Sequence, residues 1–149
     1  MKNISDEKNK NNPTTIADHN VLIIWQPEYN LGIPIVDEQH RGIVSIINSL
    51  YYGIQNKHCN RENVLMPVIN MIFDYTRIHF STEESFLEML NFPYVKQHHE
   101  LHCELIDTLS KVSKKSLLDD EPYQFIEFLK KWFIDHICDK DRKYRDYLL

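Results

Sequence analysis

The fold is decided by residues 79–102, HFSTEESFLEMLNFPYVKQHHELH, in which His79 lies four positions before Glu83 and His98 lies four before His102. Side chains four residues apart lie on one face of an α-helix, so both members of each pair can bind the same metal ion. Between the two pairs, the segment 91–93 (NFP) interrupts the helical pattern, because proline cannot continue a helix through its interior. The stretch therefore predicts two helices joined by a tight turn, each presenting potential metal ligands.

On the N-terminal side of this stretch, the sequence predicts a helix that begins near Asp37, with Asp37 as its N-cap. His40 lies in line with apolar residues that recur at helical spacing, namely Ile43, Val44, Ile46, Ile47, Leu50 and Tyr51. The second helix, which carries His79, is expected from Asn60 to about Leu90. Pro67 falls inside this range, and it either kinks the helix or marks its true start.

On the C-terminal side, the third helix is expected to cover roughly residues 93–116. Acidic residues before Pro122 then signal the start of a fourth helix. The fourth helix carries aromatic and aliphatic residues at helical spacing, followed by His136. The tail, residues 142–149, either extends this helix or forms a short fifth one.

Four amphipathic helices with short connections predict an all-α, up-down-up-down four-helix bundle, in which inward side chains from all four helices meet at one level. Only three glycines occur in 149 residues, which argues against a turn-rich β protein. Before the bundle, residues 25–34 predict an extended segment, because two prolines and a glycine prevent a regular helix. We expect residues 1–20, which are polar, to form a flexible arm and residues 21–149 to form one domain.

The composition of the chain limits the classes of partner and the cellular compartment that we expect. The net charge is −5 and no face is dense in Lys or Arg, so we expect neither nucleic acid nor an anionic membrane as a partner. The N-terminal segment contains no apolar stretch typical of a signal peptide, and no run approaches the roughly 18 apolar residues of a membrane span. Cys59, Cys103 and Cys138 occur singly, which is typical of thiols in a reducing cytoplasm. We therefore expect a cytoplasmic protein, and a monomer.

Candidate metal ligands lie on all four predicted helices: His40, His79, Glu83, His98, His102, His136 and Asp141. Five imidazoles and two carboxylates, with no thiolate, suit a pair of non-heme first-row metal ions. A lone histidine in an apolar stripe is more often a satisfied core residue than a ligand. Burying so many polar groups without a metal would be very costly, however, and the set favours a metal site. His19, His58 and His99 are interpreted as solvated histidines.

The acidic ligand of the fourth helix is ambiguous from spacing alone. Asp139 is three residues after His136, whereas Asp141 is five residues after it. Helical periodicity favours Asp139, because five residues rotate a side chain well off the face of His136. Asp141 can be a ligand only if the helix ends, tightens or carries a π-bulge at this point.

Taken together, these motifs closely resemble the hemerythrin family, and within it the single-domain bacteriohemerythrins. The resemblance covers about residues 21–149 and fills every ligand position of the family. It rests on Trp25, Gly32-Ile33, the segment 37–40 (DEQH), the segment 79–84 (HFSTEE), Phe92-Pro93, His98, His102, the segment 132–137 (WFIDHI), Asp141, Tyr144 and Tyr147. One departure is Phe92, where the family usually has tyrosine.

The resemblance implies a role for each ligand. His98, His102 and His136 would hold one iron, and His40 and His79 would hold the other. Glu83 and Asp141 would each bridge the two irons, so the family favours Asp141 over Asp139. The implied cofactor is an oxo- or hydroxo-bridged pair of iron ions with O2 as its ligand.

This ligand set leaves room for O2. Two octahedral metals offer twelve coordination positions. Five imidazoles, two bridging carboxylates and one bridging oxide or hydroxide fill all but one of them. By the family pattern, the open position lies on the iron held by His40 and His79. Candidates for an apolar wall around it are Ile43, Phe80, Trp132 and Phe133, although ordinary core packing explains each of them equally well.

The sequence therefore predicts reversible O2 binding at a di-iron centre, without catalytic turnover, as in an oxygen carrier, store or delivery protein. Two alternatives stay open at this point. One is an enzyme that reduces O2, peroxide or nitric oxide at the same centre. The other is an oxygen or iron sensor that acts through a partner, which the apparent lack of a signalling domain disfavours.

Overall fold

The computed structural model describes residues 21–55, 65–119 and 122–149. The expected arm, residues 1–20, lies outside the described residues. Within them, the elements in chain order are η1 (Pro27–Tyr29), α2 (Pro34–Gln55), α3 (Met66–Met89), α4 (Val95–Asp119), α5 (Pro122–Asp135), η3 (His136–Asp141) and α6 (Arg142–Leu148).

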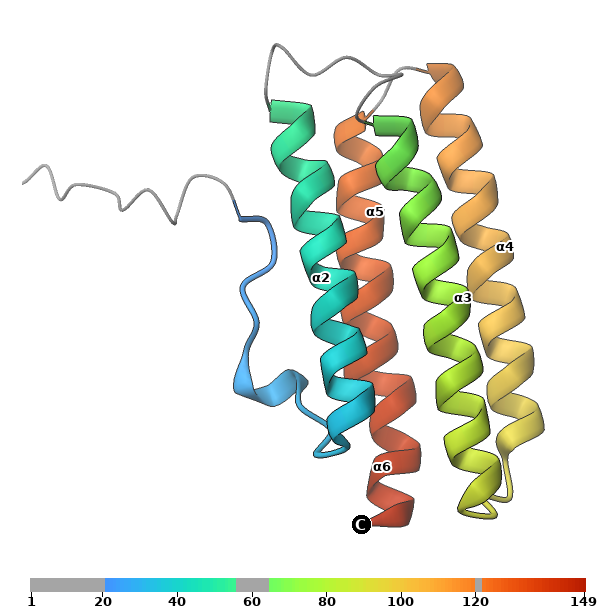
Figure 1. Ribbon diagram of the computed structural model, residues 1–149. Coiled ribbons are helices and arrows are strands. Elements are labelled where there is room, and N and C mark those ends of the chain that lie inside the picture. Colours follow the sequence, from blue (N-terminus) through green and yellow to red (C-terminus); the bar gives the residue numbers. More distant parts are fainter. Residues whose placement is uncertain (1–20, 56–64, 120–121) are drawn as a thin grey trace, which may run out of the picture.

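The four long helices lie side by side as an antiparallel bundle (Figure 1). α2 packs against α3, α3 against α4, α4 against α5, and α5 against α2, which closes the ring. α6 continues the line of α5, so these two helices and η3 form the fourth column of the bundle. The predicted all-α, up-down-up-down architecture is thereby confirmed.

Apolar stripes explain why these segments pair. On α2, the buried side chains of Ile43, Ile47 and Leu50 recur every three or four residues, which is the period of one helix face. α5 repeats the pattern with Phe125, Leu129 and other residues of the core. Among the described residues, no helix has the length and apolar character needed to cross a membrane.

The start of α2 differs from the prediction. The helix begins at Pro34, and Asp37 lies inside its first turn instead of at the N-cap. The Asp37 carboxylate accepts hydrogen bonds from the backbone N–H groups of Leu31 (2.7 Å) and Gly32 (3.0 Å). Gly32 has φ of 81°, a conformation that favours glycine. Asp37 thus anchors the entry loop to the helix, and this loop-directed contact could not be distinguished from capping by sequence position alone.

Other boundaries also shift by a few residues. α3 begins at Met66 with Pro67 in its first turn, so Pro67 marks the start of the helix, where a missing N–H costs nothing. The predicted start at Asn60 lies outside the described residues. α4 runs from Val95 to Asp119, because the chain turns at Asn91, whose φ is 53°. The entry segment is extended except for the single turn η1.

Candidate metal centre

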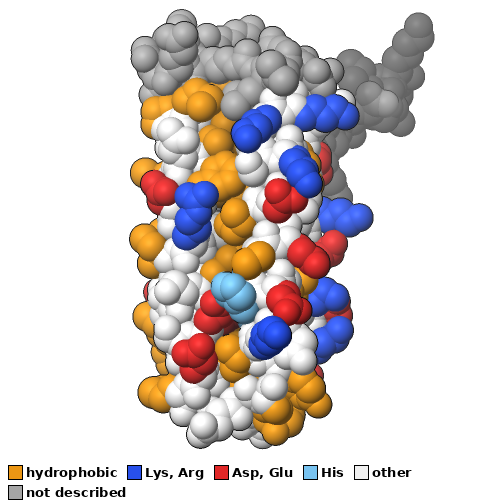
Figure 2. Space-filling view, turned by 90° about the vertical axis from the view of Figure 1, so that its right-hand side faces the viewer, with side chains coloured by type: hydrophobic (Ala, Val, Ile, Leu, Met, Phe, Trp, Pro, Cys, Tyr) orange, Lys and Arg blue, Asp and Glu red, His pale blue; other side chains and the backbone are white. Residues whose placement is uncertain are grey.

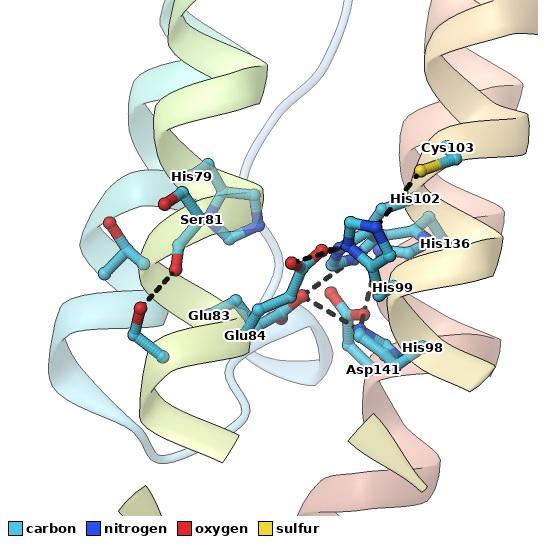
Figure 3. Close-up of polar contacts among 12 residues, drawn as sticks. His79, Ser81, Glu83, Glu84, His98, His99, His102, Cys103, His136 and Asp141 are labelled. Atoms are coloured by element: carbon cyan, nitrogen blue, oxygen red, sulfur yellow. Dashed lines mark hydrogen bonds and ion pairs between the residues drawn. The ribbon is translucent and has the colours of Figure 1, made fainter. Parts of the chain in front are cut away.

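Seven side chains from all four columns of the bundle converge in its interior. They form two groups whose ligand atoms lie within 4.8 Å of one another: Glu83, His98, His102, His136 and Asp141 in the first, and His40, His79, Glu83 and Asp141 in the second. All are buried. Figure 3 shows the α3 side chains facing those of α4 and the C-terminal column. The structure thus brings together every residue predicted as a ligand, and Glu83 and Asp141 belong to both groups.

The first group is arranged around three imidazoles. His98 Nε2 lies 2.9 Å from Glu83 Oε2 and 3.4 Å from Asp141 Oδ1. His102 Nε2 is 3.0 Å from the same Glu83 oxygen, and His136 Nε2 is 2.9 Å from the same Asp141 oxygen. One oxygen of each carboxylate therefore faces the three-histidine group.

The second group involves the other oxygen of Asp141. His40 Nε2 lies 3.2 Å from Asp141 Oδ2 and 3.1 Å from His79 Nε2. Asp141 thus presents Oδ1 to the three-histidine group and Oδ2 to the two-histidine group. A carboxylate with one oxygen toward each group has the arrangement expected of a bridge between two ions.

These separations fit ions that would lie among the ligand atoms. Adjacent ligands of an octahedral metal at about 2.1 Å stand about 3.0 Å apart, close to the distances in both groups. Several contacts are short but do not have hydrogen-bond geometry: His102 Nε2, His136 Nε2 and both oxygens of Asp141 are buried without a hydrogen bond. Buried polar atoms without partners are costly, and metal ions would satisfy all four.

A change of helix type brings Asp141 into the centre. The six residues of η3, His136–Asp141, form a π-helix between α5 and α6. A π-helical turn contains more residues than an α-helical turn, so a residue five positions after His136 returns to its face. Asp141 is completely buried, whereas the side chain of Asp139 is 59% exposed and pairs with Lys140 at 3.1 Å. The structure thereby places Asp141, and not Asp139, among the converging side chains.

Electrostatics keep both buried carboxylates ionised. Burial by itself would raise the pKa of Asp141, but the imidazoles of His136, His40 and His98 hold it well below its usual range. Burial and Asp141 raise the pKa of Glu83, yet the adjacent imidazoles of His102 and His98 lower it to about 2. Two ionised carboxylates in a buried site require nearby positive charge. Metal ions would supply that charge.

Two histidines are oriented so that Nε2 faces the centre. His79 Nδ1–H donates to Gln39 Oε1 (2.9 Å), and His102 Nδ1–H donates to Glu84 Oε1 (2.7 Å). Because the proton of a neutral imidazole is then on Nδ1, the lone pair on Nε2 is free for a metal. Burial lowers the pKa of His79 to about 3, which keeps its ring neutral.

Sequence reasoning gave no role to Gln39, Glu84 or Tyr144. The Tyr144 hydroxyl is buried and donates a hydrogen bond of 2.5 Å to Glu83 Oε1. Burial and the negative charges of Glu83 and Asp141 raise the pKa of Tyr144 far above its usual value. All three residues belong to the motifs that carry the family resemblance, which is the one available signal. Gln39 and Glu84 adjoin ligands in the chain, but adjacency on a helix does not reveal which side chains meet.

The four predicted wall residues are all buried, but they lie at different places. Phe133 packs edge-on against His40, with ring centroids 5.8 Å apart. Phe80 stacks on His102 at 3.7 Å and also lies 5.6 Å from His79. Trp132 lines a pocket with His136, on the three-histidine side. Ile43 belongs to the apolar core.

The remaining histidines differ in what can be said of them. The side chain of His99 is 57% exposed, as predicted, and it pairs with Glu84 at 2.8 Å. His19 and His58 lie outside the described residues. Of the cysteines, Cys103 is exposed and Cys138 is partly buried, and both are free thiols. Cys59 lies outside the described residues.

Comparison with known proteins agrees with the geometry. Residues 31–148 match the family described as the Hemerythrin HHE cation binding domain. A Bacteriohemerythrin of Clostridium acetobutylicum is 28% identical over 129 residues, covering 84% of this chain and 100% of that protein. A Bacteriohemerythrin of Pseudomonas aeruginosa is 29% identical, covering 83% and 80% of the two chains. A Hemerythrin-like protein of Naegleria gruberi is 27% identical, covering 83% and 92%. The chain belongs to the hemerythrin family.

Proposed function

We propose that this protein holds two non-heme iron ions and binds O2 reversibly at them. The observation that carries the proposal is the pair of ligand groups that share Glu83 and Asp141. A site for one ion would need only one such group. Two groups joined by two carboxylates suit a pair of ions held at a short, fixed separation.

In the proposed site, His98, His102 and His136 would hold one iron, and His40 and His79 would hold the other. Glu83 and Asp141 would contribute to both. The two-histidine group offers fewer ligands, so an ion there would have room for O2. When bound and reduced, the iron pair supplies electrons that O2 can share and return.

The residues of the chain favour binding without further reaction. All seven proposed ligands are buried, which limits the access of water. Phe133, against His40, keeps the two-histidine side apolar. We also propose Ile43, Phe80 and Trp132 as parts of the apolar surroundings of the centre. A dry, apolar site withholds the protons that would convert a reversible adduct into released products.

The enzyme alternative would need a proton donor near the open position. Among the described residues, Tyr144 is a protic side chain in contact with a proposed ligand, and its hydroxyl proton is committed to Glu83. Because the pKa of Tyr144 is raised, the phenol holds its proton firmly. This arrangement supports an oxygen carrier over an oxidase, a peroxide reductase or a nitric oxide reductase.

An optical experiment tests the proposal. Iron-loaded protein should contain two irons per chain. After anaerobic reduction, exposure to O2 should produce a visible absorption band that disappears when O2 is removed and returns on re-exposure. One iron per chain would contradict the two-ion site. A band that bleaches irreversibly, with continuous O2 consumption in the presence of a reductant, would support the enzyme instead.

We further propose that the protein acts as a monomer in the cytoplasm. The cytoplasmic location rests on cysteines that occur singly in the sequence, of which Cys103 and Cys138 are free thiols in the structure. Measurement of molar mass in solution, with and without metal, tests the oligomeric state.

A further inference from the structure

The three-histidine and two-histidine halves of the centre differ in the side chains that accept hydrogen bonds from their histidines. Among the described residues, side-chain partners for Nδ1 are found on His79 and His102, one in each half. His79 donates to Gln39, a neutral amide, whereas His102 donates to Glu84, a carboxylate. Nδ1 of His40 and of His136 is buried without a partner. The two halves therefore receive different charge from their surroundings.

This difference affects the metal through the imidazole ring. A carboxylate that accepts a hydrogen bond from the ligand's other nitrogen pulls the proton toward itself, so Nε2 becomes a stronger electron donor. A neutral amide does so less, because hydrogen bonds to charged acceptors are roughly twice as strong. Stronger donation stabilises the higher oxidation state of a metal and lowers its reduction potential.

We propose that Glu84 is a positioning residue that adds to the difference between the two metal sites, and that it favours ferric iron at the three-histidine site. Gln39 is its neutral counterpart at the two-histidine site. This inference rests on the proposed iron pair. It predicts that the reduction potential depends on the charge of two side chains that do not themselves bind metal.

Glu84 also connects the centre to the protein surface. Its second oxygen, Oε2, accepts a hydrogen bond of 2.8 Å from the exposed His99, and His99 Nε2 lies 3.5 Å from Cys103 Sγ. These side chains line a groove of about 640 Å³ between α3 and α4. Figure 2 views the molecule from the side of α4. A column of apolar side chains runs along this face, and a histidine lies beside acidic side chains.

Because both oxygens of Glu84 are engaged, His99 and His102 compete for one negative charge. A donor at Oε2 reduces the charge that Oε1 can offer to His102. Removing His99 should therefore act in the opposite direction to removing the charge of Glu84. This opposition of sign distinguishes an electronic role of Glu84 from a role in packing alone.

Anaerobic redox titration of the iron-loaded protein tests the inference. Glu84→Gln, which keeps the size of the side chain and removes its charge, should raise the reduction potential. Gln39→Glu and His99→Ala should both lower it. In a second measurement, competition with a chelator for Co²⁺, Glu84→Gln should weaken binding roughly 10- to 100-fold. Glu100→Gln, an equal charge change at an exposed position of α4, is the matched control and should leave both quantities unchanged.

The outcomes separate the two proposals. If the wild-type protein binds fewer than two metal ions, the proposed function fails before Glu84 is considered. If the wild type binds two metal ions, the reduction potentials of the two mutants decide the inference about Glu84. The inference is wrong if Glu84→Gln and His99→Ala have the potential of the wild type, or if both shift it in the same direction. His99 is exposed, so His99→Ala provides a result even if Glu84→Gln does not fold.

Discussion

Replacement of Phe133 by Ala tests whether the apolar surroundings protect the centre. The ring of Phe133 is 2% exposed and packs edge-on against His40, with ring centroids 5.8 Å apart. Truncating a buried Phe to Ala typically costs about 3–5 kcal/mol in unfolding free energy. For a domain of 149 residues, each kcal/mol lowers the melting temperature by roughly 2–4 °C. The expected loss is therefore on the order of 6–20 °C.

The cavity left by the mutation should also admit water. A buried water needs polar partners, and Nδ1 of His40 is buried without one. Water beside His40 would bring protons to the two-histidine side of the centre. We therefore expect Phe133→Ala to bind two irons but to lose its O2-dependent visible band faster than the wild type, as followed by absorption after a single exposure to O2.

Phe125→Ala is the matched control. Phe125 is a core residue of the same helix, 3% exposed. It lies eleven positions before His136, or about 16 Å along a helix axis. The Phe125→Ala protein should lose a similar amount of unfolding free energy, while the lifetime of its visible band stays equal to that of the wild type. Equal lifetimes for Phe133→Ala and the wild type would refute a protective role of Phe133, and equal shortening in both mutants would attribute the effect to lost stability.

Three further predictions address the ligands and their surroundings. Asp141→Asn should abolish binding of the second iron in an elemental assay, whereas Asp139→Asn should not. The reverse result would identify Asp139 as the ligand and contradict the assignment of Asp141. Tyr144→Phe should destabilise the metal-free protein by about 1–3 kcal/mol in denaturant unfolding, since Glu83 Oε1 loses its buried donor, and an unchanged midpoint would contradict this contact. Burial lowers the pKa of His98, but the adjacent carboxylates of Asp141 and Glu83 outweigh this effect and raise the pKa to about 9. Protonated His98 should therefore stabilise the metal-free protein fully below pH 6.5, and up to about 3 kcal/mol of unfolding free energy should be lost as the pH rises through 9. A melting temperature that rises over this pH range would contradict the prediction.

Helical spacing is sufficient to predict the bundle and most of the polar side chains that converge in its interior. His79 with Glu83, and His98 with His102, each share one face, so their positions follow from the period of a regular helix. Asp141 does not follow from that period, because η3 is a π-helix. Only the family resemblance selected it, since no rule of local sequence predicts where a helix widens.

Side chains that meet between helices were the hardest to predict. The sequence predicts Asp37 as an N-cap, yet Asp37 binds the entry loop from inside the first turn of α2. Glu84 points from α3 to a histidine of α4, a contact that depends on how far the two helices are rotated about their axes. Sequence periodicity identifies the buried face of a helix, but it does not determine such rotations.

The contact between His40 and Asp141 has a consequence for folding. His40 belongs to α2 and Asp141 to η3, about 100 residues apart in the chain. Ions held in common by these helices would fasten the beginning of the bundle to its end, so no single helix could detach without breaking a metal bond. Backbone amides near the ligands would then exchange with solvent only through opening of the whole bundle. A metal centre that draws on every helix thus joins four separately marginal helices into one cooperative unit.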